Sequence, residues 1–299
     1  MTGPLLMVAS AAAWAAGLVL TKVTLDSSGA EPSSVLLVQL GASVGVLAAA
    51  CLVSGAWPRS GWRQGWVGLL EPGVAYQLAL AGLALTSATN ATVLGSLEPV
   101  MVPLIAWLLL RDRPRPRLIV LVAGATIGSA LVSFSGGNDS GSLVGDALVV
   151  ASVAAAALYV VVASRHVTAL RPLPAALGQQ VWALGFVAVS HLVLSGGAFW
   201  PQLGFDGLLL AALSGVVNYA LPFWLYLSAL TRMPVARAAT YLTLIPVFGV
   251  LGSAVLLGEG IGWLDILGSA LVVAALLFDA TTSAPAKPHA KQPAERSRR

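Results

Sequence analysis

The chain has 299 residues, of which 58% are hydrophobic and only 9% are charged, and its mean hydropathy is +0.87. Soluble domains carry about 25% charged residues, so this composition excludes a soluble protein and indicates one that lies in a lipid bilayer. The formal net charge is +4, which by itself would allow an acidic partner such as nucleic acid.

The apolar residues form successive runs, each about as long as the ~20 residues that a helix needs to cross a bilayer. The predicted helices span residues 4–24, 33–54, 65–85, 90–110, 118–135, 145–164, 174–194, 207–230, 235–257 and 262–279. Because the runs are continuous rather than alternating, they favour membrane helices over the strands of a barrel. The predicted fold class is therefore an all-α polytopic membrane protein with ten transmembrane helices.

The basic residues predict how the chain is oriented. Of the 16 Lys and Arg residues, all but Lys22 fall in the even-numbered connections between helices or after the last helix. Basic residues are retained on the cytoplasmic side of a membrane, so we predict a multi-pass protein of the plasma or inner membrane with both termini in the cytoplasm. This distribution also explains the positive net charge, and we exclude nucleic acid as a partner. No basic segment precedes the first run, so a cleaved signal peptide is not expected.

The two halves of the sequence resemble each other at a spacing of 147 residues. This spacing aligns Pro99 with Pro246 and, one helix length later, Asp112 with Glu259. Each half holds five predicted helices, and since five is odd, the second half crosses the membrane in the opposite sense to the first. Such inverted repeats recur in secondary transporters, which bind their substrates near the middle of the bilayer.

Several motifs resemble the EamA repeat of the drug/metabolite transporter superfamily. They are the helix around Pro99, the acids that end the matched helices, the glycine-rich helix that follows and the opening segment AAAWAAGLVLTK, with the residues Trp14, Gly17, Lys22, Asp112, Gly124, Gly128, Glu259 and Gly268. The resemblance implies a first five-helix repeat over residues 1–135, a second over 144–280, and a transporter of small metabolites with a central cavity lined by both. Residues 281–299 are rich in Pro, Ala and charge, and predict a disordered basic cytoplasmic tail. Asp112 lies in an arginine-rich stretch, so we assign it a structural role.

Glu98 is the first candidate for the substrate or proton site. It is predicted to lie about eight residues into the fourth helix, or ~12 Å at the helical rise. An acid at that depth costs about 2.5–3.5 kcal/mol to insert, so such residues nearly always face a cavity or a partner. Gly95 and Ala91 on the same helical face leave space beside it, and an ionisable group there suits proton coupling or recognition of an ammonium group. The alternative is a structural acid paired with a backbone amide near Pro99.

Glu71 is the second candidate, directly before Pro72 and Gly73 in the third helix. Transporters use broken helices near the bilayer midplane to expose backbone groups to a substrate. The repeat spacing pairs Glu71 with Asn218, so we predict that both face one central space; a later start of the third helix, with Glu71 at the membrane interface, is the alternative. Further candidates for the cavity lining are the aromatic and amide residues Tyr241, Trp14, Tyr76, Gln77, Tyr219 and Trp224.

The predicted function is secondary-active export of an amino acid or amine, with proton coupling and with each half rocking around a central cavity. The alternatives are efflux of lipophilic cations or drugs and, from other classes, a membrane-embedded enzyme or a non-transporting membrane subunit. The sequence has no HExxH, G-x-S-x-G or P-loop motif, one cysteine and three scattered histidines, so we expect no enzymatic activity, no catalytic residues, no metal and no cofactor. The expected partners are a small-molecule substrate and the lipid bilayer, and both a monomer and a homodimer stay open.

Overall fold

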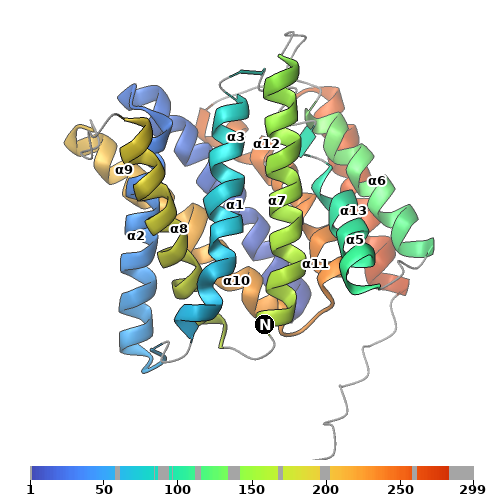
Figure 1. Cartoon of the computed structure of the whole chain (residues 1–299). Coiled ribbons are helices and arrows are strands. Elements are labelled where there is room, and N and C mark those ends of the chain that lie inside the picture. Colours follow the sequence, from blue (N-terminus) through green and yellow to red (C-terminus); the bar gives the residue numbers. More distant parts are fainter. Residues whose placement is uncertain are drawn as a thin grey trace, which may run out of the picture.

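The structure is a computed structural model that describes residues 2–57, 61–83, 85–86, 94–95, 97–111, 116–133, 142–167, 171–195, 203–257 and 261–282. In these ranges every regular element is helical, and the helices form one bundle (Figure 1). Continuous apolar runs produce this result, because a helix satisfies all of its backbone hydrogen bonds within one segment, as the interior of a bilayer requires.

The first half of the chain supplies five crossings. Its elements are α1 (Gly3–Ser28), α2 (Pro32–Val53), η1 (Gly61–Leu69), η2 (Leu70–Val74), α3 (Ala75–Leu83), α5 (Glu98–Leu110) and α6 (Pro116–Ser133). The third crossing consists of η1, η2 and α3 in succession. α1 and α2 have a proline in their first turn, where the missing N–H breaks no helical hydrogen bond, and α1 ends at Gly29 in the left-handed conformation (φ 61°).

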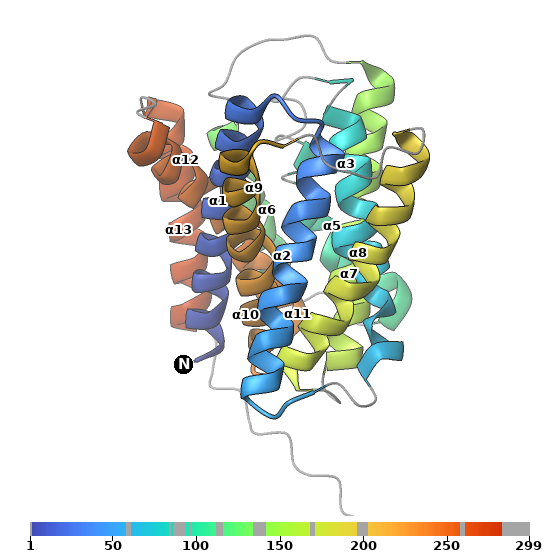
Figure 2. The ribbon, with the colours of Figure 1, turned by 90° about the vertical axis from the view of Figure 1, so that its left-hand side faces the viewer.

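The second half repeats this order with five more crossings. Its elements are α7 (Leu143–Val167), α8 (Pro172–Leu194), α9 (Phe205–Gly215), η4 (Val216–Ala220), α10 (Leu221–Leu230), α11 (Val235–Leu242), α12 (Leu244–Leu257) and α13 (Trp263–Thr282). The eighth crossing consists of α9, η4 and α10, and the ninth of α11 and α12. α1 begins and α13 ends at the same end of the molecule (Figure 2), as an even number of crossings requires.

The hydropathy of the helices matches a membrane protein. In the described part of the chain, five helical stretches are long and apolar enough to cross a bilayer, namely Gly3–Leu25, Pro32–Val53, Leu143–Ala163, Pro172–Val193 and Phe205–Leu230. The shorter apolar helices Val100–Leu109 and Arg237–Gly252 belong to crossings that contain a break. The predicted class of all-α polytopic membrane protein with two inverted five-helix repeats is confirmed.

The prediction of one continuous fourth helix over residues 90–110 is wrong. Leu97 forms a turn, and α5 begins at Glu98. The physical reason is Pro99, which has no N–H to donate and therefore breaks no helical hydrogen bond when it lies in the first turn of a helix. The ninth crossing breaks in the same way, because Thr243 forms a turn between α11 and α12 shortly before Pro246. Glu98 thus lies at the beginning of a half-helix and not deep inside a full one.

The two repeats interleave and do not pack as separate halves. α1 packs mainly against α9, α10 and α12 of the second repeat, and α7 packs against α3 and α5 of the first. α2 packs against α9, α8 packs against η1, and α6 packs against α13. Each contact has its counterpart when the repeats are exchanged, as a pseudo-two-fold axis in the membrane plane requires. The halves of the chain are therefore not the packing units of the bundle, and the expectation that each half rocks around the cavity stays a prediction.

Candidate substrate site

Two π-helical segments mark equivalent places in the two repeats. η2 carries Glu71 and η4 carries Asn218. The backbone of Glu71 is extended (φ −147°, ψ 128°) inside η2, since a residue that precedes proline disfavours the helical conformation. η1 begins at Gly61, so the alternative in which the third helix starts after Glu71 is wrong. π-Helical turns are frequent at functional sites, and both of these carry a polar side chain within a crossing.

The two π-helical segments come together through tyrosine rings. The ring centroids of Tyr76, at the start of α3, and Tyr219, in η4, are 5.2 Å apart with an interplanar angle of 61°. Aromatic rings prefer this edge-to-face arrangement. Tyr219 also interacts electrostatically with Glu71 of the other repeat. The structure therefore gathers side chains from both broken helices at one centre of the bundle.

Two carboxyl groups lie at this centre. Glu71 and Glu98 come from different crossings of the first repeat, interact electrostatically and are both partly exposed. Glu98 is in the first turn of α5, where unpaired backbone N–H groups and the helix dipole favour a negative charge. Two neighbouring carboxylates repel each other, and a proton or a cation relieves this repulsion. The pair can therefore hold a proton or an ammonium group.

An aromatic cluster borders the two carboxyl groups. The ring of Trp14 lies 5.2 Å from that of Phe223 and 5.8 Å from that of Tyr226, between centroids. Tyr159 of α7 contacts the same two rings at 5.9 and 6.3 Å. Tyr159 and Tyr226 both interact electrostatically with Glu71. Sequence reasoning named Trp14 but missed the other three; Tyr226 follows Asn218 by about two helical turns, a spacing that could have revealed it.

The buried hydroxyl of Tyr226 has no hydrogen-bond partner within the described residues. The side chains of Trp14 and Asn218 interact with the hydroxyls of Tyr76 and Tyr219 instead. Asn218 is 1% exposed and lies directly against Gly17 of α1, where an added Cβ would overlap it. Buried polar groups are nearly always paired, so the hydroxyl of Tyr226 is suited to a substrate or to water.

Trp224 lies on the exposed side of α10. Its side chain is 40% exposed, and Leu221, which shares its face of α10, is 39% exposed. Side chains three residues apart lie on the same side of a helix, and this side faces away from the one that buries Phe223 and Tyr226. Trp224 is therefore not part of the aromatic cluster, and its place in the cavity lining stays a prediction.

The remaining candidates have less defined surroundings. Tyr241 is buried in α11 just before the break of the ninth crossing. Gln77 is partly exposed on α3, and its Nε2 has no hydrogen-bond partner among the described residues. The matched acids Asp112 and Glu259 lie outside the part of the chain that the structure describes.

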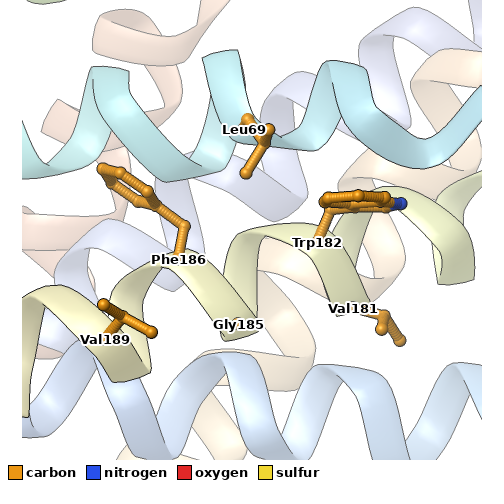
Figure 3. Close-up of a pocket in the computed structure, with 6 residues that line it drawn as sticks. All are labelled: Leu69, Val181, Trp182, Gly185, Phe186 and Val189. Atoms are coloured by element: carbon orange, nitrogen blue, oxygen red, sulfur yellow. The ribbon is translucent and has the colours of Figure 1, made fainter.

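A separate groove of about 420 Å³ lies beside α8 (Figure 3). It is lined by Leu69, Val181, Trp182, Gly185, Phe186 and Val189. The exposed residue Trp182 donates a hydrogen bond from Nε1 to the backbone carbonyl of Trp62 at 2.6 Å. Every lining residue is apolar or a glycine, so the groove offers no charged group to hold a charged substrate.

Interleaved inverted repeats, broken helices and carboxyl groups within a membrane-spanning bundle define a polytopic membrane protein of the secondary-transporter type. The family model of the EamA-like transporter family matches residues 1–134 and 143–279. The chain therefore belongs to the EamA-like transporter family, within the drug/metabolite transporter superfamily.

The chain is also similar to individual transporters. It is 26% identical over 208 residues to the uncharacterized transporter YetK of Bacillus subtilis strain 168, covering 65% of this chain and 60% of that protein. It is 29% identical over 140 residues to the threonine/homoserine exporter RhtA of Salmonella typhimurium, covering 47% of this chain and 46% of that protein. These matches span less than two thirds of the relatives' own lengths. A crystal structure of another protein superimposes with a TM-score of 0.79 at 18% identity, covering 94% of this chain and 96% of that one, so the fold is shared.

Proposed function

We propose that this transporter exports an amino acid or a related amine-bearing metabolite in exchange for protons. The observation that carries the proposal is the pair of carboxyl groups of Glu71 and Glu98, which interact electrostatically beside Tyr76 at the meeting point of the broken helices. Ionisable residues inside a membrane mark ion and substrate pathways.

The chemistry follows from competition for the carboxyl pair. A proton and an ammonium group both neutralise it, so binding of one favours release of the other. The rings of Tyr76 and Tyr219, which interact electrostatically with Glu71, would add cation–π attraction for an ammonium group. The name of the relative RhtA, a threonine/homoserine exporter, supports an amino acid as the substrate.

Transport in proteoliposomes tests this proposal. Purified protein would be reconstituted and offered labelled threonine, homoserine, other amino acids and simple amines, with and without a pH gradient. We expect accumulation of at least one of these compounds that increases when the gradient is imposed. Equal fluxes with protein-free liposomes for every compound would overturn the proposal, and a flux that ignores the gradient would overturn the proton coupling.

Efflux of lipophilic cations is a second candidate function, and the aromatic cluster favours it. Trp14, Phe223, Tyr226 and Tyr159 form a connected set of rings next to Glu71, as a site for a large apolar cation would need. Competition between tetraphenylphosphonium and the amino acids distinguishes the two functions. Tetraphenylphosphonium would be transported in one case and would at most block transport in the other.

A further inference from the structure

α2 and α8 occupy equivalent places in the two repeats and align at a constant spacing of 140 residues. This spacing pairs Pro32 with Pro172 and Gln39 with Gln179. The two helices lie side by side and run in opposite directions (Figure 2). Each glutamine lies about 10 Å from the start of its helix, at 1.5 Å per residue. Because the two helices run in opposite directions, these distances are measured from opposite ends of the bundle. Both side chains are almost fully buried, with exposed fractions of 1% and 2%.

Each glutamine touches the broken helix of the opposite repeat at a glycine. A Cβ built on Gly215 would overlap the backbone of Gln39, and one built on Gly68 would overlap the backbone of Gln179. The two glycines are themselves equivalent at the 147-residue repeat spacing. Each one lies about one helical turn before the polar residue of its π-helical segment. These two tight contacts between the repeats are therefore directly next to the site.

The side chain of Gln39 joins three helices. Its Nε2 donates to Oγ1 of Thr21 in α1 at 2.7 Å and to Oγ of Ser214 in α9 at 2.8 Å. Thr21 donates its own hydroxyl hydrogen to the carbonyl of Gly17, and Ser214 donates to the carbonyl of Ala211. Since both hydroxyls present only lone pairs, the position needs a donor, which an amide supplies and a carboxylate does not.

The side chain of Gln179 is bonded through its amide oxygen and not, as in Gln39, through its amide nitrogen. Its Oε1 accepts a hydrogen bond of 2.8 Å from the hydroxyl of Tyr159 in α7. Tyr159 in turn contacts the rings of Phe223 and Tyr226. α8 is thereby fixed both to η1, through Gly68, and to the aromatic cluster.

We propose that Gln39 and Gln179 are positioning residues for the two halves of the site. Gln39 holds α9 at Gly215 and so fixes the place of Asn218 against α1. Gln179 holds the hydroxyl of Tyr159 and so fixes the side of the aromatic cluster that borders Glu71. The role of these two residues in transport rests on the proposed function, but their effect on the position of the site residues can be measured without a substrate.

The test combines two reporter cysteines with two glutamine variants. In a Cys51→Ala background, Glu71→Cys and Asn218→Cys would each be combined with Gln39→Leu and with Gln179→Leu, and labelled with a small water-soluble maleimide. We expect Gln39→Leu to change the labelling rate at position 218 by about threefold or more while leaving position 71 unchanged, and Gln179→Leu to do the reverse. Equal changes at both positions, or none, would overturn the proposal. Ser214→Ala and Tyr159→Phe break the same hydrogen bonds from the partner side, and they should reproduce the pattern more weakly.

Transport gives an independent readout. Gln179→Leu should shift the pH profile of threonine uptake, because it displaces a titratable carboxyl group, whereas Gln39→Leu should raise KM and leave the pH profile unchanged. A purely structural role would lower the amount of active protein and move neither quantity. A parent protein that transports nothing would overturn the proposed function, whereas the labelling pattern alone decides the positioning.

Discussion

Two carboxyl groups, those of Glu71 and Glu98, lie among tyrosine rings at the centre of this bundle. The two residues are far apart in the chain, but each of them directly precedes a proline. Pro72 removes the helical conformation from Glu71, and Pro99 puts Glu98 into the first turn of a helix. In both cases the proline frees backbone groups near the carboxyl group.

Replacing Glu98 with Gln tests the role of its proton. The amide keeps the size of the side chain, and insertion should not suffer because a neutral group is less costly in hydrocarbon. We expect proton-driven transport to fall by at least about tenfold, equivalent to ~1.4 kcal/mol, and Glu98→Asp to recover part of it. The measurement is initial uptake in proteoliposomes over a range of pH. If the Gln variant is expressed normally and transports at the parental rate and with the parental pH dependence, Glu98 has only a structural role.

Gly17 is a residue whose small size has a defined reason. A methyl group there would overlap the backbone and Cβ of Asn218, so α1 could not approach η4. We expect Gly17→Ala to lower the free energy of unfolding by about 1–3 kcal/mol, as overpacking generally does. Gly41→Ala is the matched control, since Gly41 is exposed and has no atom within 4 Å of its Cβ position. Thermal unfolding in detergent should show a lower midpoint for the first variant alone.

At the scale of the helical elements, the two π-helical segments differ in the exposure of their polar residues. η2 holds a partly exposed Glu71, whereas η4 holds a buried Asn218 pressed against Gly17. The equivalent π-helical segments of the two repeats therefore lie in different environments, and the polar residue of η2 is more exposed than that of η4. In an alternating-access transporter, such a difference between equivalent elements distinguishes the open side from the closed side.

Cysteine labelling can measure this asymmetry. In a Cys51→Ala background, we expect Glu71→Cys to react several times faster than Asn218→Cys with a water-soluble thiol reagent, because of the difference in exposure. A transported substrate should slow the reaction at position 71. Faster labelling at position 218 would contradict the described arrangement of η2 and η4, and protection at neither position would place the substrate elsewhere.

For the molecule as a whole, the helices of the two repeats interleave. α1 packs with α9, α10 and α12, and α7 packs with α3 and α5, whereas α2 and α8 pack against each other. The aromatic cluster joins these elements across the repeats, since Trp14 belongs to α1, Phe223 to α10 and Tyr159 to α7.

The orientation in the membrane is a further prediction. Reporter fusions within Leu203–Phe205 and at residues 136–138 should report an external location, and fusions near residue 115 or in the C-terminal tail should report the cytoplasm. We expect this orientation because basic residues are retained on the inner side of a membrane. Of the 16 Lys and Arg residues, all but Lys22 fall in the connections and the tail that are predicted to lie on that side. Periplasmic alkaline phosphatase and cytoplasmic fluorescent reporters provide the measurement. An external tail would reverse the predicted topology.

The number, type and approximate limits of the helices follow from the sequence alone. Each apolar run must satisfy its backbone within itself to enter a bilayer, so length and hydropathy suffice to recognise it. The repeat spacing likewise follows from the sequence, because Pro99 and Pro246 are matched residue by residue. It paired Glu71 with Asn218, and the structure has a π-helical segment at each of these positions.

The partners of these residues were decided by the tertiary structure. Tyr159 was not recognised as part of the aromatic cluster, because its contacts with Phe223 and Tyr226 join segments that are far apart in the chain. The exposed position of Trp224 was not foreseen either, because a helix that is apolar on all sides gives no sign of which face meets lipid and which meets protein. In a bilayer both faces are apolar, so hydropathy cannot separate them. The packing of one helix against another makes that distinction.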